Sequence, residues 1–181
     1  MLWRADMIIV DGHEYCKNDL IYFTSTEEVP CPKCGGKLHV RGTCERQLRG
    51  KEYGVKTYRL RVMECKECGR THRELPKNII PYKRMEASWI SEFAWVSHEQ
   101  EIGGSESSVW RRVKEWVFLF LQYAQATLEL LPVSYCYDSY EALKTALTSS
   151  VKTIANQGKW ITASFGADSA AGRMLYSRQS I

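Results

Sequence analysis

Two short cysteine motifs constrain this chain more than any other feature of its sequence. The stretch VPCPKCGGKLHV places Cys31 and Cys34 two residues apart with glycine behind them, and VMECKECGRTHRELP repeats the spacing at Cys65 and Cys68. Two intervening residues let one tight turn point both thiolates at one ion, and zinc prefers four such ligands in a tetrahedron. Glycine suits the position behind each pair because the turn needs a positive φ there. The spacing therefore predicts a zinc site made by these four cysteines.

Disulfides and a redox-active dithiol are the alternative interpretations. The chain has seven cysteines, an odd number, and its first residues, MLWRADMIIVDG, lack the apolar run of a secretory signal. We therefore expect a cytoplasmic protein in a reducing compartment, where disulfides are rare. Cys16, Cys44 and Cys136 stand alone, as small buried hydrophobes often do. His39 and His72 are alternative ligands near the pairs, although four cysteines already complete the shell.

The segment between the motifs has the period of a β-strand. In KTYRLRVM, apolar and polar residues alternate, so that Tyr58, Leu60 and Val62 share one face. MIIVDG and LIYFTS, in the first thirty residues, are further candidate strands. We expect an α+β fold in which a zinc ribbon, a small antiparallel β structure, precedes a helical region that resembles a helix-turn-helix. The expected divisions are a lead-in and ribbon at 1–80, the helical region at 81–131 and a final helix and tail at 132–181.

Three helical patterns follow the ribbon. The first lies in PYKRMEASWISEFAWVS, the second begins near Ser105 and ends before Pro132, and the third follows a cap at Asp138 or Ser139 and closes at Gly158. The short stretch HEQEIGG separates the first two. This order predicts a helix-turn-helix with the second long helix as the recognition helix. The last residues, from Lys159, have no clear period, and we expect a disordered tail or a strap for a partner.

Positive charge is concentrated on the expected ribbon. Residues 31–84 contain 15 Lys and Arg against 5 Glu, whereas the whole chain has a net charge of only +4. Such a concentration is typical of proteins that contact a phosphate backbone; a solvated β surface is the alternative. The predicted phosphate contacts are Arg41, Arg46, Arg49, Arg59, Arg61, Lys83 and Arg84. The predicted contacts from the recognition helix are Ser107, Ser108, Arg111, Arg112 and Lys114.

Several motifs together resemble a known group of proteins. CPKCGG, RLRVMECKECGRTHRELP, PYKR and GGSESSVWRRVKEW are similar to the N-terminal region of insertion-sequence transposases, which carry a zinc ribbon and a helix-turn-helix. They resemble still more closely an uncharacterised family of small bacterial proteins that keep this ribbon without a transposase body. The resemblance covers roughly residues 31–117. It implies the four cysteines as zinc ligands and the helix from Ser105 as the recognition helix.

Catalytic signatures are absent from the sequence. A transposase core needs three carboxylates on a sheet, but Asp138, Glu141 and Asp168 have no strand pattern around them. No phosphate-binding loop, metalloprotease helix or nucleophile–base pair is evident. No apolar run reaches the roughly 18 residues of a membrane helix. We therefore expect a non-enzymatic protein that does not span a membrane.

The sequence thus predicts a zinc-dependent DNA-binding protein of a mobile-element or regulatory kind. One alternative is an RNA-binding zinc ribbon, for which Tyr53, Tyr58 and Tyr82 are candidate base-stacking residues. Another is an interaction module. Its long apolar helix, 109–131, would form a homodimer or bind a transposase-like partner. A transposase remnant without function is the third.

Overall fold

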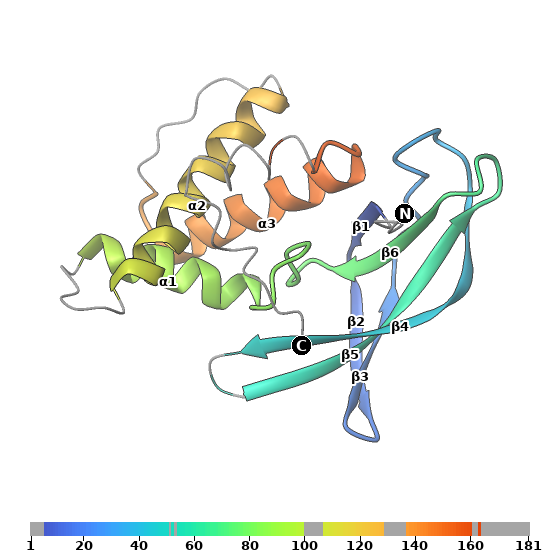
Figure 1. The fold of residues 1–181 in the computed structure, drawn as a ribbon, viewed down its shortest axis with the longest axis horizontal. Coiled ribbons are helices and arrows are strands. Elements are labelled where there is room, and N and C mark those ends of the chain that lie inside the picture. The colour runs from blue at the N-terminus through green and yellow to red at the C-terminus, as the bar shows by residue number, and fades with distance from the viewer. Residues whose placement is uncertain are drawn as a thin grey trace. The chain divides into compact units, whose positions relative to one another are not determined.

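The structure is a computed structural model that describes residues 6–50, 52, 54–99, 107–128, 137–160 and 163. Of residues 96–99 and 107–112 it describes the backbone alone. The chain forms two compact units. A sheet unit takes residues 1–86 and 151–158, and a helical unit takes residues 87–150 and 159–181 (Figure 1).

Six strands make one curled sheet in the sheet unit (Figure 1). Five strands follow the order β1-β6-β5-β3-β2, and β4 pairs with β5 along nearly the whole length of both. The pairs β1–β6 and β3–β5 are parallel, and the others are antiparallel. The strands are β1 (Asp6–Val10), β2 (Gly12–Lys17), β3 (Leu20–Ser25), β4 (Leu38–Gly50), β5 (Gly54–Cys65) and β6 (Thr71–Pro76).

The predicted fold class is therefore wrong. A small antiparallel ribbon would contain only the strands around the cysteine motifs, whereas three of the six strands come from the first 25 residues, and two of the pairings are parallel. The expected strands at MIIVDG and LIYFTS are present as β1 and β3. Their apolar side chains need a buried face, and the ribbon strands supply one by extending into a larger sheet.

The core of the sheet unit follows the sequence pattern. Tyr58 and Leu60 of β5 are fully buried, as the alternation in KTYRLRVM predicts. Ile8 and Ile9 are consecutive yet both buried, as expected of a strand covered on both faces. Further fully buried side chains are Leu48, Leu75, Ile79 and Ile80.

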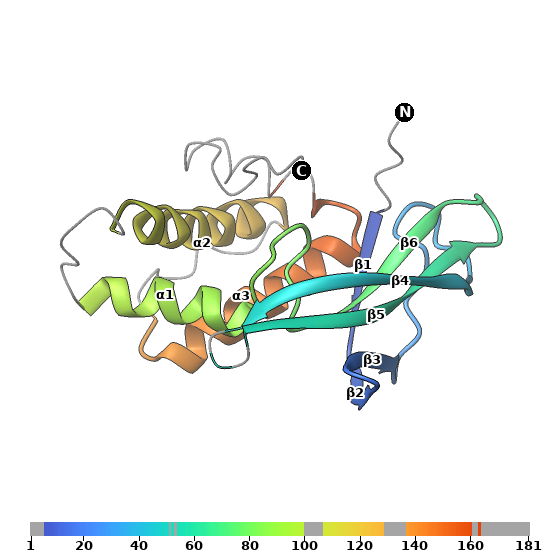
Figure 2. The same ribbon diagram turned by 60° about the horizontal axis from the view of Figure 1, so that its bottom comes forward.

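The helical unit contains α1 (Ala87–Glu99), α2 (Ser107–Thr127) and the first part of α3 (Tyr140–Asn156). Helices α1 and α2 lie side by side (Figures 1 and 2). Trp116 stacks on Phe120, and Phe120 contacts Trp160, so the apolar stripe of α2 is buried within its own unit. Ser139 caps α3 by accepting a hydrogen bond from the backbone N–H of Ala142, as expected.

The described residues do not show the expected helix-turn-helix. The stretch HEQEIGG is expected to separate two helices, but α1 continues through His98 and Glu99, so no separate helix begins at His98. Residues 100–106 lie outside the described part of the chain, as do the side chains of Ser107, Ser108, Arg111 and Arg112. The expected tail also lies outside it from residue 164 onwards. Among the described helices, none is long and apolar enough to cross a bilayer.

Candidate metal centre and basic surface

Each cysteine pair lies on a tight backbone turn, and the two turns have the same hydrogen bonds. The N–H of Gly35 donates to the Cys31 carbonyl at 2.8 Å, and that of Gly69 donates to the Cys65 carbonyl at 3.0 Å. Both glycines have positive φ, 76° and 68°, as predicted. The first turn precedes β4 and the second follows β5. Because β4 and β5 are antiparallel, both turns lie at the same end of that pair.

The four sulfur atoms form one cluster. All lie within 4.8 Å of one another, with Cys31 and Cys68 3.8 Å apart and Cys34 and Cys65 3.5 Å apart. A tetrahedral ion with metal–sulfur bonds of about 2.3 Å requires sulfur–sulfur edges of about 3.8 Å. The four thiols are free, and these distances are too long for a disulfide. The predicted cysteines therefore come together and could hold a metal ion.

A second glycine, Gly36, sets how closely the two turns approach. A Cβ built on Gly36 would lie 2.3 Å from Cγ of Glu67 and 3.0 Å from Sγ of Cys65, both in the opposite turn. Only glycine fits this contact without displacing a sulfur ligand. The sequence did not single out Gly36, because its role depends on a turn about thirty residues away.

His72 on β6 lies beside the cluster rather than in it. Its Nε2 is 3.3 Å from Sγ of Cys31, and its side chain is fully buried. Burial lowers the pKa of His72, which keeps the ring neutral. With the proton on Nε2, the ring can donate a hydrogen bond to the thiolate, as residues behind metal ligands often do. His39, the other alternative ligand, is exposed and pairs with Glu64 on the facing strand.

The surroundings of the cluster act differently on its thiols, because burial raises the pKa of Cys31 whereas the second turn lowers that of Cys65. The backbone N–H of Cys68 points at Cys65 and, with that of Glu67, lowers the pKa of the Cys65 thiol to about 7. Metals bind the thiolate, so a lowered pKa assists binding near neutral pH.

Several predicted phosphate contacts are already ion-paired. Arg59 pairs with Glu45 at 3.0 Å, directly across the β4–β5 register, and Arg41 pairs with Glu64 at 3.3 Å. Arg61 binds Glu74 through two hydrogen bonds of 2.5 and 2.7 Å. The positive charges of these three arginines are therefore largely compensated within the sheet unit.

The remaining predicted contacts differ in exposure. Arg49 and Arg84 are exposed, Lys83 is buried, and Lys114 on α2 is half-buried. Arg46 is partly buried and donates hydrogen bonds from Nη2 to the carbonyls of Ile80 and Lys83. Arg73 of β6, which the charge count did not distinguish, is exposed as well.

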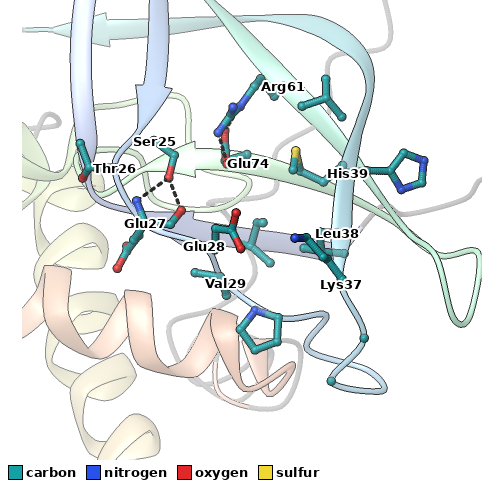
Figure 3. Close-up of a pocket in the computed structure, with 16 residues that line it drawn as sticks. Ser25, Thr26, Glu27, Glu28, Val29, Lys37, Leu38, His39, Arg61 and Glu74 are labelled. Atoms are coloured by element: carbon teal, nitrogen blue, oxygen red, sulfur yellow. Dashed lines mark hydrogen bonds and ion pairs between the residues drawn. The ribbon is translucent and has the colours of Figure 1, made fainter.

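One hollow of the sheet unit lies beside the first cysteine turn and has a volume of about 640 Å³ (Figure 3). Arg61 and Glu74 on one wall bind each other, and Glu27 on another wall binds Lys152. Because Arg61, Glu74 and Glu27 are already ion-paired, little of their charge is left for a ligand, and we assign this hollow no binding role.

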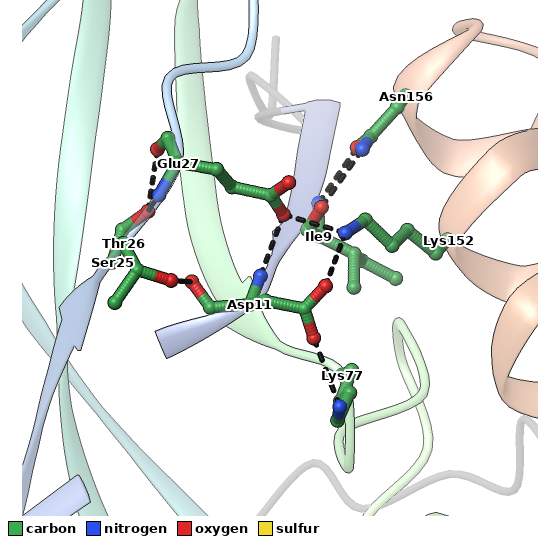
Figure 4. A network of polar contacts seen from close by, with 8 residues as sticks. All are labelled: Ile9, Asp11, Ser25, Thr26, Glu27, Lys77, Lys152 and Asn156. Atoms are coloured by element: carbon green, nitrogen blue, oxygen red, sulfur yellow. Dashed lines mark hydrogen bonds and ion pairs between the residues drawn. The ribbon is translucent and has the colours of Figure 1, made fainter. Parts of the chain in front are cut away.

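The end of α3 is fixed to β1 and to the turn after it by polar contacts (Figure 4). The amide side chain of Asn156 accepts from the N–H of Ile9 and donates to its carbonyl, both at 2.8 Å. Lys152 forms ion pairs of 2.6 Å with Asp11 and Glu27, and Lys77 approaches Asp11 from the other side at 3.0 Å. Residues 151–158 thus cover the edge of β1 that faces away from β6.

The fold and the site define a protein with a four-cysteine cluster that could hold a metal ion, in a sheet rich in basic residues. A family model described as a domain of unknown function (DUF6431) matches residues 31–112, less than half of the chain. No curated protein and no solved structure matches the chain. The matched stretch is nearly the one on which the resemblance rests. The relation to transposases remains a prediction.

Proposed function

We propose that this protein is a zinc-dependent, non-catalytic DNA-binding protein, in which one zinc ion joins the two cysteine turns and cations of the sheet unit contact DNA phosphates. The observation that carries the proposal is the positive charge left after ion pairing. Of the five glutamates in residues 31–84, three already bind arginines of that segment: Glu45, Glu64 and Glu74. Exposed cations such as Lys33 and Lys66, on the cysteine turns, remain for an anionic partner.

Zinc is the metal that the ligand set favours. Four thiolates in a tetrahedron select zinc or iron–sulfur chemistry among the common biological metals, and paired C-x-x-C turns on β structure are typical of structural zinc. Such a site contributes about 10–16 kcal/mol of apparent binding free energy, which is also folding free energy. Elemental analysis should find one zinc per chain, and Cys65→Ser should lose both the metal and the fold of the sheet unit.

Binding of duplex DNA is the test of function. A labelled random duplex should bind the zinc-loaded protein with an affinity that falls steeply with salt, by about 0.9 in log–log slope for each neutralised phosphate. Changing Lys33 and Lys66 together to Gln should reduce that slope by up to about two. Lys144→Gln is the control, because Lys144 lies on α3 and already pairs with Glu141. An affinity that does not change with salt concentration, or an equal reduction of the salt slope in the control variant, would contradict the proposal.

Single-stranded RNA is the principal rival ligand. Of the tyrosines expected to stack on RNA bases, Tyr58 is fully buried, with its hydroxyl bonded to Glu14 and Asn78, so it offers no stacking surface. Tyr53 lies outside the described residues. In competition, unlabelled duplex DNA should displace the labelled duplex at lower concentration than single-stranded RNA of equal length. The reverse order would favour the RNA-binding alternative.

A further inference from the structure

The second hollow of the sheet unit, of about 500 Å³, is lined by arginines from separate elements. Arg46 and Arg49 come from β4, Arg73 comes from β6, and Arg84 follows the turn after β6. Among the described residues of its lining, Glu45 alone carries a carboxylate. This hollow differs from the first one, in whose lining Arg61 and Glu74 bind each other.

Backbone contacts fix the arginines around the hollow. The N–H of Arg49 donates to the carbonyl of Arg84 at 2.7 Å, so these two residues lie side by side. Nη2 of Arg46 donates to the carbonyls of Ile80 and Lys83 at 3.1 and 2.6 Å. A guanidinium that is already held in place loses little conformational entropy when a ligand binds.

Most of this positive charge has no partner within the described residues. No described acidic group pairs with Arg49, Arg73 or Arg84, and the carboxylate of Glu45 already binds Arg59. Nε and Nη1 of Arg46 likewise have no partner in that part of the chain. Burial, and then repulsion from Arg73, lowers the pKa of Arg46 to about 10, so its guanidinium still carries its charge at neutral pH. An anion in the hollow would relieve this repulsion.

Tyr82 adds a second unusual feature at the rim. Its φ is 61°, a left-handed conformation that costs a non-glycine residue free energy. Residues held in such conformations cluster at ligand sites, where the surrounding structure enforces them. Tyr82 belongs to PYKR, the segment that also provides the Lys83 carbonyl for Arg46 and the side chain of Arg84.

We propose that this hollow binds one phosphate group, held by Arg46, Arg73 and Arg84 with Arg49 at its edge, and that in DNA binding this group is a backbone phosphate. Arginine suits this role because its planar donors match phosphate oxygens in pairs. That the bound phosphate belongs to DNA rests on the proposed function, whereas the binding of a phosphate group in the hollow does not. The hollow would place one backbone phosphate at a defined position among the less specific contacts of the sheet unit.

The first measurement uses inorganic phosphate and the zinc-loaded full chain. Calorimetric titration at ionic strength held constant with sodium chloride should give saturable binding of one phosphate per chain. Arg73→Gln and, separately, Arg84→Gln should each weaken it about tenfold or more, as expected for loss of a hydrogen bond between charged groups. Both side chains are exposed, so the variants should keep their zinc and their circular dichroism spectra. Arg41→Gln, on β4 but outside the hollow, should bind phosphate like the natural protein.

The second measurement tests whether the phosphate belongs to DNA. Inorganic phosphate should displace a labelled duplex more effectively than chloride at equal ionic strength, in the natural protein and in Arg41→Gln but not in Arg73→Gln. If phosphate binding depends on Arg73 but the protein has no affinity for DNA, the phosphate site is supported and the proposed function is rejected. Absence of saturable phosphate binding, or equal binding by Arg73→Gln and Arg41→Gln, would overturn the phosphate site and leave DNA binding to be judged by its own test.

Discussion

Nε2 of His72 lies 3.3 Å from Sγ of Cys31, and no part of the His72 side chain reaches solvent. Nδ1 of the same ring is buried with no hydrogen-bond partner within the described residues. Leaving a buried nitrogen unpaired costs free energy. The contact between Nε2 and the Cys31 sulfur, in which the ring donates when Nε2 carries the proton, is therefore the polar contact that accounts for a histidine at this position.

Replacing His72 should weaken metal binding. His72→Ala removes the donor to Cys31, and loss of a residue behind a ligand typically lowers metal affinity about 10–100-fold. His39→Ala is the matched control, because His39 is exposed and contacts Glu64 rather than a cysteine. Competition for zinc against a coloured chelator measures both affinities. Equal affinities in the two variants would show that His72 only fills space.

Gly36→Ala should separate the two cysteine turns. The added methyl group would lie 2.3 Å from Cγ of Glu67, closer than real Cβ atoms approach, and 3.0 Å from Sγ of Cys65, a tight contact, so the second turn must shift and zinc affinity should fall. Gly42→Ala places the same group on β4 with no atom within 4 Å, and should bind zinc normally. The ratio of zinc affinities of the two variants gives the result, and a ratio near one would contradict the close approach of the turns.

Arg61→Ala should destabilise the protein strongly. It leaves the carboxylate of Glu74, whose side chain is only 3% exposed, without its partner, a change that typically costs about 3–5 kcal/mol. Arg41→Ala breaks an exposed pair with Glu64 and should cost at most about 1 kcal/mol. Urea unfolding of the zinc-loaded variants compares the two. Combining Arg61→Ala with Glu74→Leu should recover part of the loss, because no buried charge then remains.

Acid should unfold Lys152→Met at a higher pH than the natural protein. Hydrogen bonds with Lys152, and then with Lys77, lower the pKa of Asp11. The stabilisation from this carboxylate is complete above its unfolded pKa of about 3.9 and is lost as pH falls through the lower folded value. Without Lys152, the folded pKa of Asp11 moves back toward its unfolded value. The carboxylate then stabilises the fold less, and unfolding in acid begins at a higher pH.

At alkaline pH the titrating group is Lys152, and its pKa shift has the opposite sign to that of Asp11. Burial alone would lower the pKa of Lys152, but its hydrogen bonds to Asp11 and Glu27 raise the pKa overall. Stability from the ammonium group is therefore present below its unfolded pKa and is lost only as pH rises through the higher folded value. Circular dichroism during acid and alkaline titration measures the pH at which each variant unfolds. Lys144→Met, elsewhere on α3, should leave both pH values unchanged.

Local signals in the sequence predicted which four cysteines come together. The spacing of Cys31 and Cys34, and of Cys65 and Cys68, together with glycines of positive φ, is determined within each turn. Gly36 and His72 carried no such signal, because the groups that they contact are far away in sequence. Their roles follow from the β4–β5 and β5–β6 pairings.

The arrangement of the strands was harder to predict for the same reason, and so was the question of which arginines are ion-paired. Alternation identified the strand at β5, but nothing local indicated that Asp6–Val10 pairs in parallel with β6. A charge count treats all arginines alike, whereas the strand register decides that Arg59 faces Glu45 and is neutralised. Arg73 differs only in having no acidic neighbour that pairs with it among the described residues.

Asn156 completes the free edge of β1 with two hydrogen bonds to Ile9, and Gly158 closes α3 against the carbonyl of Pro32, beside the first metal ligand. During translation, the residues that cover β1 are made nearly 150 residues after it. Until Asn156 is made, the nascent chain therefore carries an apolar strand with unpaired backbone groups, which is a template for association with neighbouring chains. A fragment cut at the bounds of the matched family region would lose both β1 and its cover, so expression of the isolated domain should begin before Asp6 and extend past Gly158.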